Sequence, residues 1–93
     1  MTYAVFKAIV TNPEALAAYR DQAGAALARH GGKVEQASAT PEALDGKPTI
    51  PSVTAILSFP DADAARAWIN DPELAELHDL RRSAGQTEIM LLA

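Results

Sequence analysis

The sequence contains no cysteine, and this absence narrows its chemistry before any motif is considered. Disulfide bonds, thiolate metal sites and a cysteine nucleophile are all excluded. The chain also lacks the Gly-x-Gly-x-x-Gly, P-loop and Gly-x-Ser-x-Gly patterns, so nucleotide cofactors and an esterase-type serine have no support. We therefore expect a protein that works without a cofactor.

Positive charge is also scarce, with eight Lys and Arg against twelve Asp and Glu and a formal net charge of −4. The basic residues are scattered apart from the pair Arg81-Arg82, so the chain lacks the basic patch of a nucleic-acid binder. No apolar run approaches the ~18 residues of a membrane span. Residues 1–10 are apolar but carry no basic n-region of a signal peptide. We expect a soluble, cytoplasmic protein without nucleic-acid or membrane partners.

What is present suits one small globular domain over residues 1–93. Apolar residues make up 48% of the chain and charged residues 22%, which is far from the composition of disordered chains. A domain of this size buries only about 60–65% of its unfolded surface. We therefore expect modest stability unless a partner adds buried area.

Turn residues divide the chain into alternating strands and helices. Asn12 and Pro13 suit the start of a helix, and Gly31-Gly32 suits its end. The proline-rich segment 40–51 indicates a loop that holds one helical turn at 42–44. The expected elements are a strand at 3–10, a helix at 14–30, an edge strand at 33–39, a strand at 52–59, helical pieces at 64–69 and 72–82, and a strand at 87–92.

This βαββαβ order is the ferredoxin-like arrangement of the α+β class. It predicts a four-stranded antiparallel sheet with the first and third strands in the middle and both helices on one face. Alternate strand residues point to opposite faces. One set is uniformly apolar and is assigned to the helix side: Ala4, Phe6, Ala8, Val53, Ala55, Leu57 and Phe59.

The opposite face of the sheet mixes apolar and polar side chains. Its expected members are Tyr3, Val5, Lys7, Ile9, Ser52, Thr54, Ile56 and Ser58, with Glu88, Met90 and Leu92 from the last strand. Such a face would be an exposed apolar patch in a monomer. Pairing two of these faces across a two-fold axis would cover the patch and enclose a cavity lined by a few polar groups. We therefore predict a homodimer with space for a small-molecule ligand.

Short motifs recur in a characteristic order along nearly the whole chain. They are Thr11-Asn12-Pro13-Glu14, Tyr19, Gly31-Gly32, Leu44-Asp45-Gly46, Phe59-Pro60, Ala64-Ala65-Arg66-Ala67-Trp68, Asp71-Pro72-Glu73 and Leu80-Arg81. With this order and spacing the chain resembles the dimeric α/β-barrel superfamily and, within it, the small bacterial domain-of-unknown-function family numbered thirteen-thirty. The resemblance implies a ferredoxin-like protomer and a dimeric α/β barrel, but no settled activity.

The wider superfamily includes cofactor-free oxygenases, muconolactone-type isomerases, polyketide-type cyclases and haem-handling enzymes, and its fold also hosts binding proteins. The chain departs from the family pattern at three positions. Ala37 stands where an arginine often follows the second strand, Asp45 replaces the usual glutamate, and Leu74 replaces a tyrosine. Any site that used those groups would be altered here.

Candidate site residues come from the mixed face and from the two imidazoles. Lys7 is expected beside Glu88. If it is desolvated, its pKa falls and it can serve as a base or bind an anion. Otherwise it forms a structural ion pair at the dimer interface or extends its ammonium group to the rim. Tyr19 offers a hydroxyl to a ligand or only packs its ring. We expect ligand contacts from Tyr3, Thr54, Ile56 and Glu88, and catalytic roles for Lys7, Tyr19 and His78.

The remaining polar residues have plainer expectations. His30 and His78 show no metal-binding spacing, so we expect no metal site; His30 suits a helix C-terminus, and His78 faces either a pocket or water. Trp68 is expected in the core. Arg81 and Arg82 are expected on the surface near a helix C-terminus, with one of them in reach of Asp79 or a carboxylate ligand.

Two functional hypotheses are consistent with these residues. The first is a dimer that binds a small, partly aromatic or carboxylated metabolite, with or without a cofactor-free isomerase, cyclase or oxygenase reaction. The second is a non-catalytic interaction or structural module whose polar groups only complete the dimer interface. Haem binding through His30 or His78 is a third, weaker alternative.

Overall fold

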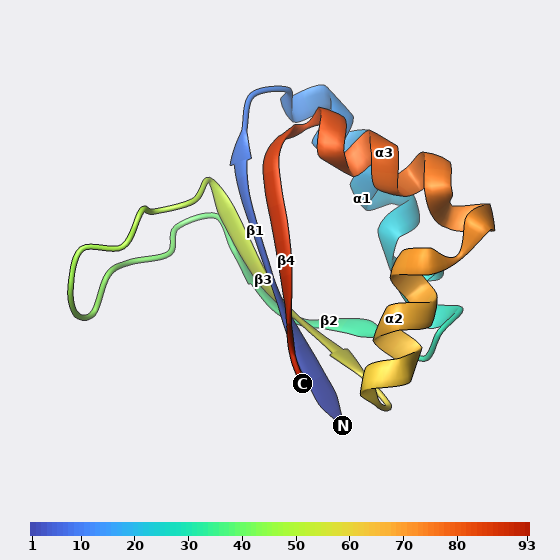
Figure 1. Ribbon diagram of the computed structural model, residues 1–93. Coiled ribbons are helices and arrows are strands. Elements are labelled where there is room, and N and C mark those ends of the chain that lie inside the picture. Colours follow the sequence, from blue (N-terminus) through green and yellow to red (C-terminus); the bar gives the residue numbers. More distant parts are fainter.

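Four antiparallel strands form a single sheet in the computed structural model, which describes residues 1–93 (Figure 1). The elements in chain order are β1 (Thr2–Val10), α1 (Pro13–Ala28), β2 (Lys33–Ser38), β3 (Val53–Phe59), α2 (Ala62–Asn70), the 3₁₀ turn η1 (Pro72–Leu74), α3 (Ala75–Ser83) and β4 (Gly85–Leu92). The strand order is β2-β3-β1-β4, which confirms the ferredoxin-like α+β fold. The sheet of one chain is open, with β2 and β4 as free edges, and does not itself close into a barrel.

Local capping explains where the helices begin and end. The Asn12 side chain accepts a hydrogen bond from the Ala15 amide at 3.2 Å, with Pro13 at the first helical position. After α1, Gly31 takes a positive φ of 73°, and the Gly32 amide closes the turn on a carbonyl of α1. Asp61 caps α2 in the same way, through the Ala64 amide at 2.7 Å.

Several boundaries differ from the sequence expectation. The stretch 72–82, expected as one helical piece, is split into η1 and α3 after the Asp71 cap. The last strand begins at Gly85 rather than at residue 87. Gly85 has a φ of 151°, and a Cβ atom there would lie 2.1 Å from the Ile9 carbonyl oxygen, so this close approach of β4 to β1 requires glycine. No helical turn forms at 42–44, so that expectation was wrong. The four residues between Pro41 and Gly46 are too few to nucleate a helix.

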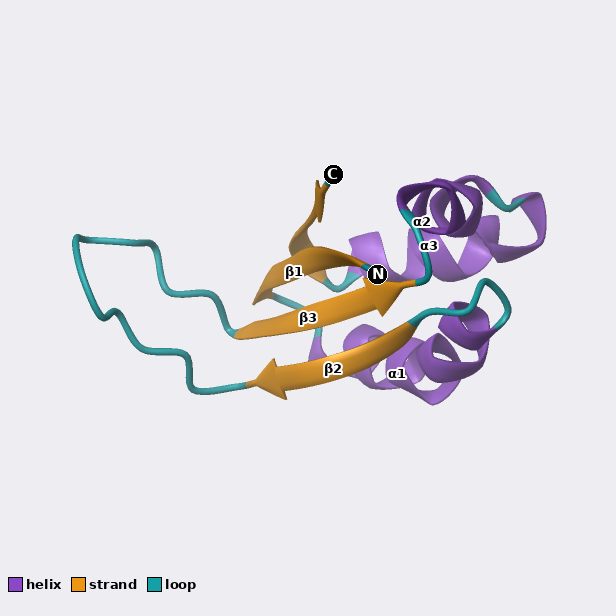
Figure 2. Cartoon of the chain, turned by 90° about the horizontal axis from the view of Figure 1, so that it is seen from below, coloured by secondary structure: helices purple, strands orange, loops and turns teal.

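The helices cover one face of the sheet and leave the other uncovered (Figure 2). The set assigned to the helix side is fully buried, and Trp68 joins it in the core at 2% exposure, as predicted. The uncovered face, called the open face below, carries the exposed apolar side chains Tyr3, Ile9, Ile56, Met90 and Leu92. Ser58 also lies on this face, opposite Tyr3 in the β1–β3 register, but it is buried there, and its hydroxyl donates to Glu35 at 2.8 Å beside a bulge in β2.

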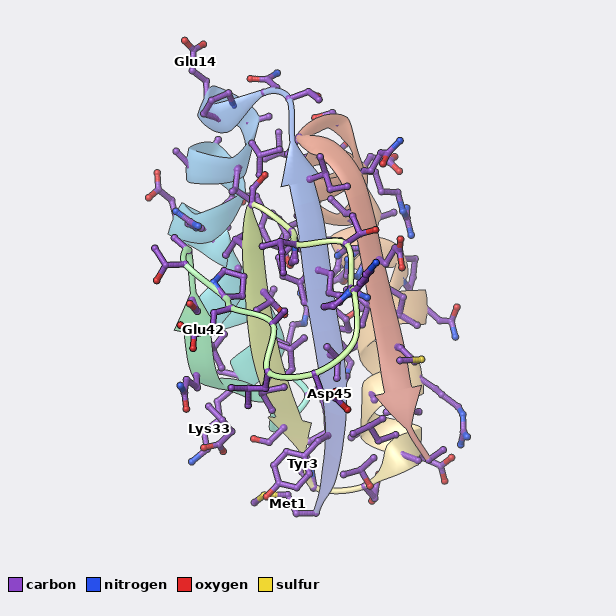
Figure 3. The ribbon with its side chains drawn as sticks, turned by 90° about the vertical axis from the view of Figure 1, so that its left-hand side faces the viewer. Met1, Tyr3, Glu14, Lys33, Glu42 and Asp45 are labelled. Carbon is purple, nitrogen blue, oxygen red and sulfur yellow. The ribbon has the colours of Figure 1, made fainter.

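The segment 39–52 joins β2 to β3 as an irregular arm. It projects from the sheet on the side opposite the helices, and Figure 3 shows it in front of the open face, with Asp45 on the arm and Tyr3 on the sheet. No helix of the structure has both the length and the apolar composition needed to cross a membrane.

Candidate functional site

A cavity of about 340 Å³ lies on the helix side of the sheet, between α2, α3 and strands β1 and β4. Most of its lining is apolar, and its polar members are Thr87 and three arginines, with no acidic residue among them. The lining residues are Ala4, Phe59, Ala65, Arg66, Trp68, Ile69, Arg81, Arg82, Thr87, Ile89 and Leu91. A protein with net charge −4 thus gathers three of its eight basic residues around one apolar cavity.

Arg81 is the most unusual member of this lining, because it is only 3% exposed and has no counter-ion. No carboxylate oxygen lies within 4.0 Å of its guanidinium, and its Nε has no hydrogen-bond partner. Its Cζ atom lies 5.7 Å from the ring centroids of both Tyr19 and Trp68. Cation–π contacts compensate only part of the cost of burying a charge.

His78 holds Arg81 in place from the preceding turn of α3. Its Nε2 lies 3.1 Å from the Trp68 carbonyl, which can only accept, so Nε2 carries the proton and donates. The other ring nitrogen, Nδ1, then accepts a hydrogen bond from Arg81 Nη1 at 2.6 Å. Burial lowers the pKa of His78, and the charges of Arg81 and Arg82 lower it further. His78 is therefore a neutral imidazole with both nitrogens engaged.

These contacts correct two expectations from the sequence. His78 faces neither a pocket nor water, because its ring is 1% exposed and packs edge-on against Trp68 with ring centroids 4.8 Å apart. Arg81 is buried rather than on the surface. The spacing of Leu74, His78 and Arg81 places all three on one helix stripe, and this was the signal that could have predicted the burial of Arg81.

The other two arginines of the cavity are on its rim. Arg66 and Arg82 have side chains 57% and 55% exposed and pair with Asp63 and Asp79 at 3.1 and 3.2 Å. The Arg82–Asp79 pair fulfils the prediction that one of the two adjacent arginines reaches Asp79. Exposed i,i+3 pairs of this kind are weak, so breaking either pair costs little.

The predicted site residues fall into two groups on opposite sides of the sheet. Tyr19 and His78 lie on the helix side with Arg81, and Tyr19 is buried at 9% exposure. The open face carries the rest: Tyr3, Lys7, Thr54, Ile56 and Glu88.

On the open face, the polar groups have few specific contacts. Lys7 and Glu88 are register partners on β1 and β4, as predicted, but no ion pair joins them within 4.0 Å. The Thr54 hydroxyl donates to the Phe6 carbonyl at 2.9 Å, so it serves the sheet itself. A cavity of only about 60 Å³ lies between Lys7, Glu88 and the base of the arm. This volume admits a few water molecules and no metabolite.

His30 takes part in an ion cluster that ties the end of α1 to the turn before η1. Its Nε2 lies 2.9 Å from Asp71 Oδ2, and Arg29 contacts both Asp71 and Glu73. The hydrogen bond from His30 is the main cause of a lowered pKa at Asp71. No group of three or more potential metal-ligating side chains occurs anywhere in the chain. With both nitrogens of His78 engaged, that histidine is also not available to ligate haem.

Comparison with known proteins agrees with this fold. The model of the family described as "Domain of unknown function (DUF1330)" matches residues 1–93. A search of curated proteins gives no match. The crystal structure of RPA0582, a protein of unknown function from Rhodopseudomonas palustris, is similar with a TM-score of 0.77 and 23% identity, over 98% of this chain and 79% of that one. A structure of methylated RPA0582 gives a TM-score of 0.75 and 23% identity, over 98% and 78% of the two chains.

Proposed function

The chain belongs to the DUF1330 family, whose description assigns no activity, and from the chain's own geometry we propose that it binds a small molecule with an apolar body and a carboxylate group in the helix-side cavity. One observation carries the proposal: Arg81 is buried beside that cavity without a counter-ion. A carboxylate in the cavity supplies the missing charge. The apolar lining from Phe59, Ile89 and Leu91 accommodates the remainder of the ligand.

The size and composition of the cavity support this ligand class. Small-molecule pockets span roughly 300–1,000 Å³ and combine an apolar lining with a few polar groups, so about 340 Å³ fits a small metabolite. Guanidinium groups bind carboxylates through two parallel hydrogen bonds, so an arginine such as Arg81 suits this role better than a lysine. No acidic side chain lines the cavity, and the acidic partners of Arg66 and Arg82 lie outside the lining, so Arg81 is the one arginine of the lining without a counter-ion.

Binding, rather than turnover, is the activity that the geometry favours. A general base needs a side-chain atom that is free to accept a proton and lies within reach of the ligand. His78 has no free nitrogen, and Lys7 lies on the other face of the sheet. His78 is therefore a positioning residue for Arg81 in this proposal.

Isothermal titration calorimetry with matched probes tests the proposal. Benzoate should bind in a saturable manner, and benzamide, which has the same shape without the charge, should bind at least about tenfold more weakly, because a hydrogen bond to a charged group contributes about 1.5–3 kcal/mol. Arg81→Met should abolish the difference between the two probes. Arg20→Met, which removes a charge from α1 outside this cavity, is the control. Equal binding of both probes by the wild-type protein would refute the proposal.

A second proposal concerns assembly, and the exposed apolar side chains of the open face favour it. We propose that two copies pair through this face and so close a dimeric α/β barrel. Met90 and Leu92 on β4 are 59% and 55% exposed, and the helices lie on the other face of the sheet (Figure 2). An apolar face of this kind on a small domain is typical of an interface. Lys7 and Glu88 would then lie between the two sheets.

Sedimentation velocity at micromolar concentration tests this assembly. The wild-type chain should sediment as a dimer. Ile56→Lys places a charge in the middle of the open face and should give a monomer, whereas Ala67→Lys on the exposed side of α2 should leave the dimer intact. A wild-type monomer would contradict the assembly and would leave the ligand proposal standing, because the helix-side cavity lies within one chain.

A further inference from the structure

We propose that the arm, residues 39–52, packs against the second copy of the chain and clasps it. This inference rests on the proposed dimer and goes beyond it, because it assigns the arm a partner and a role that the sheet face does not require. By two-fold symmetry each chain would give one arm and receive one.

The arm makes few hydrogen bonds with its own protomer. Hydrogen bonds occur only near its two ends, where the Thr40 amide donates to the Ser38 hydroxyl and the Ser52 amide donates to the Ala8 carbonyl, at 3.1 and 2.8 Å. No hydrogen bond in the structure involves residues 41–51. An irregular segment of this length within a small domain is uncommon and usually has a function of its own.

The arm also presents apolar side chains that its own chain leaves in water. Leu44, near the tip, is 93% exposed, and Ile50 is 49% exposed. Pro41, Pro48 and Pro51 restrict the backbone and so reduce the conformational entropy that is lost when the arm binds. A proline-restricted segment with an exposed leucine near its tip is suited to packing against a protein surface.

The direction and reach of the arm identify the second copy as its partner. The arm projects from the side of the sheet on which the open face lies (Figures 1 and 3). Each leg has about six residues and spans about 20 Å when extended, whereas two packed sheets lie about 10 Å apart. A second sheet seated on the open face would therefore lie alongside the arm, within reach of Leu44. The acidic residues Glu42 and Asp45 flank Leu44 and argue against an anionic lipid surface as the partner.

Intermolecular paramagnetic relaxation enhancement tests the arm directly. Because the chain has no cysteine, Asp45→Cys accepts a single nitroxide label beside Leu44 while leaving that leucine in place. The labelled chain, at natural isotope abundance, is mixed with unlabelled ¹⁵N wild-type chain. Amides of the ¹⁵N chain should broaden, and the broadening should vanish when the same mixture is made with Ile56→Lys in both chains.

The outcomes separate the arm from the dimer. A dimer in sedimentation without intermolecular broadening would overturn the arm and leave the dimer intact, whereas a monomer would overturn both. As a second readout, Leu44→Ser should weaken the dimer at least about tenfold, because two buried leucines are lost per dimer. Val34→Ser is the matched control, because it replaces another exposed aliphatic side chain by serine but lies on the helix side of β2. It should leave dimer affinity unchanged. An unchanged dimer affinity in Leu44→Ser would also overturn the arm.

Discussion

Replacing Arg81 by methionine tests whether this arginine is there for a ligand or for the fold. If Arg81 serves a ligand, the ligand-free protein bears the cost of a buried guanidinium that lacks a counter-ion and has an unpaired Nε. Arg81→Met removes that cost while keeping most of the side-chain volume. We therefore expect the ligand-free variant to lose much less stability than is usual for the truncation of a buried side chain.

The magnitude follows from opposing contributions. Exchanging buried ionic groups for apolar ones of similar volume is often neutral or stabilises by about 1–4 kcal/mol. Against this, the variant loses cation–π contacts to Tyr19 and Trp68, together worth about 1–3 kcal/mol, and leaves the buried His78 Nδ1 without its donor, at a cost of about 1–3 kcal/mol. The two sides largely offset each other, so the free energy of unfolding should fall by no more than about 2 kcal/mol.

Urea unfolding followed by fluorescence measures this change, since Trp68 is the only tryptophan and lies in the core next to Arg81. The unfolding slope should stay constant, so that midpoints can be compared. His78→Leu should lower stability more than Arg81→Met, because it leaves the guanidinium buried without its one hydrogen-bonded neighbour. A loss of about 3 kcal/mol or more in Arg81→Met would refute the reasoning and make Arg81 a structural residue.

Two further predictions address stability at other positions. The pKa of His78 is lowered in the folded state, so the unfolded chain binds more protons in acid. The free energy of unfolding should therefore be constant above about pH 6.5 and fall below it by up to about 1.4 kcal/mol per pH unit. Urea titrations at several pH values should show this fall in the wild type and a smaller one in His78→Gln. Gly85→Ala should lower the free energy of unfolding by about 3 kcal/mol or more, because its Cβ would lie 2.1 Å from the Ile9 carbonyl oxygen. Gly24→Ala, in α1 with no atom near the added Cβ, should instead raise it by about 0.5–1 kcal/mol. Equal thermal midpoints for the two variants would contradict this account.

The fold was predictable because its signals are local. Strand alternation separated the buried set around Phe6 and Leu57 from the open face, and the Asn12-Pro13 start and Gly31-Gly32 end placed α1 within two residues. The apolar side chains of the open face, on which the proposed dimer rests, were also visible in the sequence. These features depend on neighbours in the chain or across adjacent strands.

The candidate site was less predictable because it depends on tertiary approach. Nothing near Arg81 in the sequence shows that Tyr19 of α1 and Trp68 of α2 meet its guanidinium, and arginine is ordinarily a surface residue. For the same reason, Lys7 and Tyr19 were grouped in one site although the sheet separates them. The burial of Ser58 on the open face was also not predictable, because it depends on the approach of Glu35 beside the bulge in β2.

A crystal structure of the complex with 4-bromobenzoate tests the central claim most directly, since anomalous scattering from bromine fixes the orientation of the ligand. The account predicts a bromine peak within the apolar part of the helix-side cavity, near Ile89 and Leu91, with the carboxylate within about 4 Å of the Arg81 guanidinium. A ligand on the open face, or one in the cavity with its carboxylate turned away from Arg81, would contradict it.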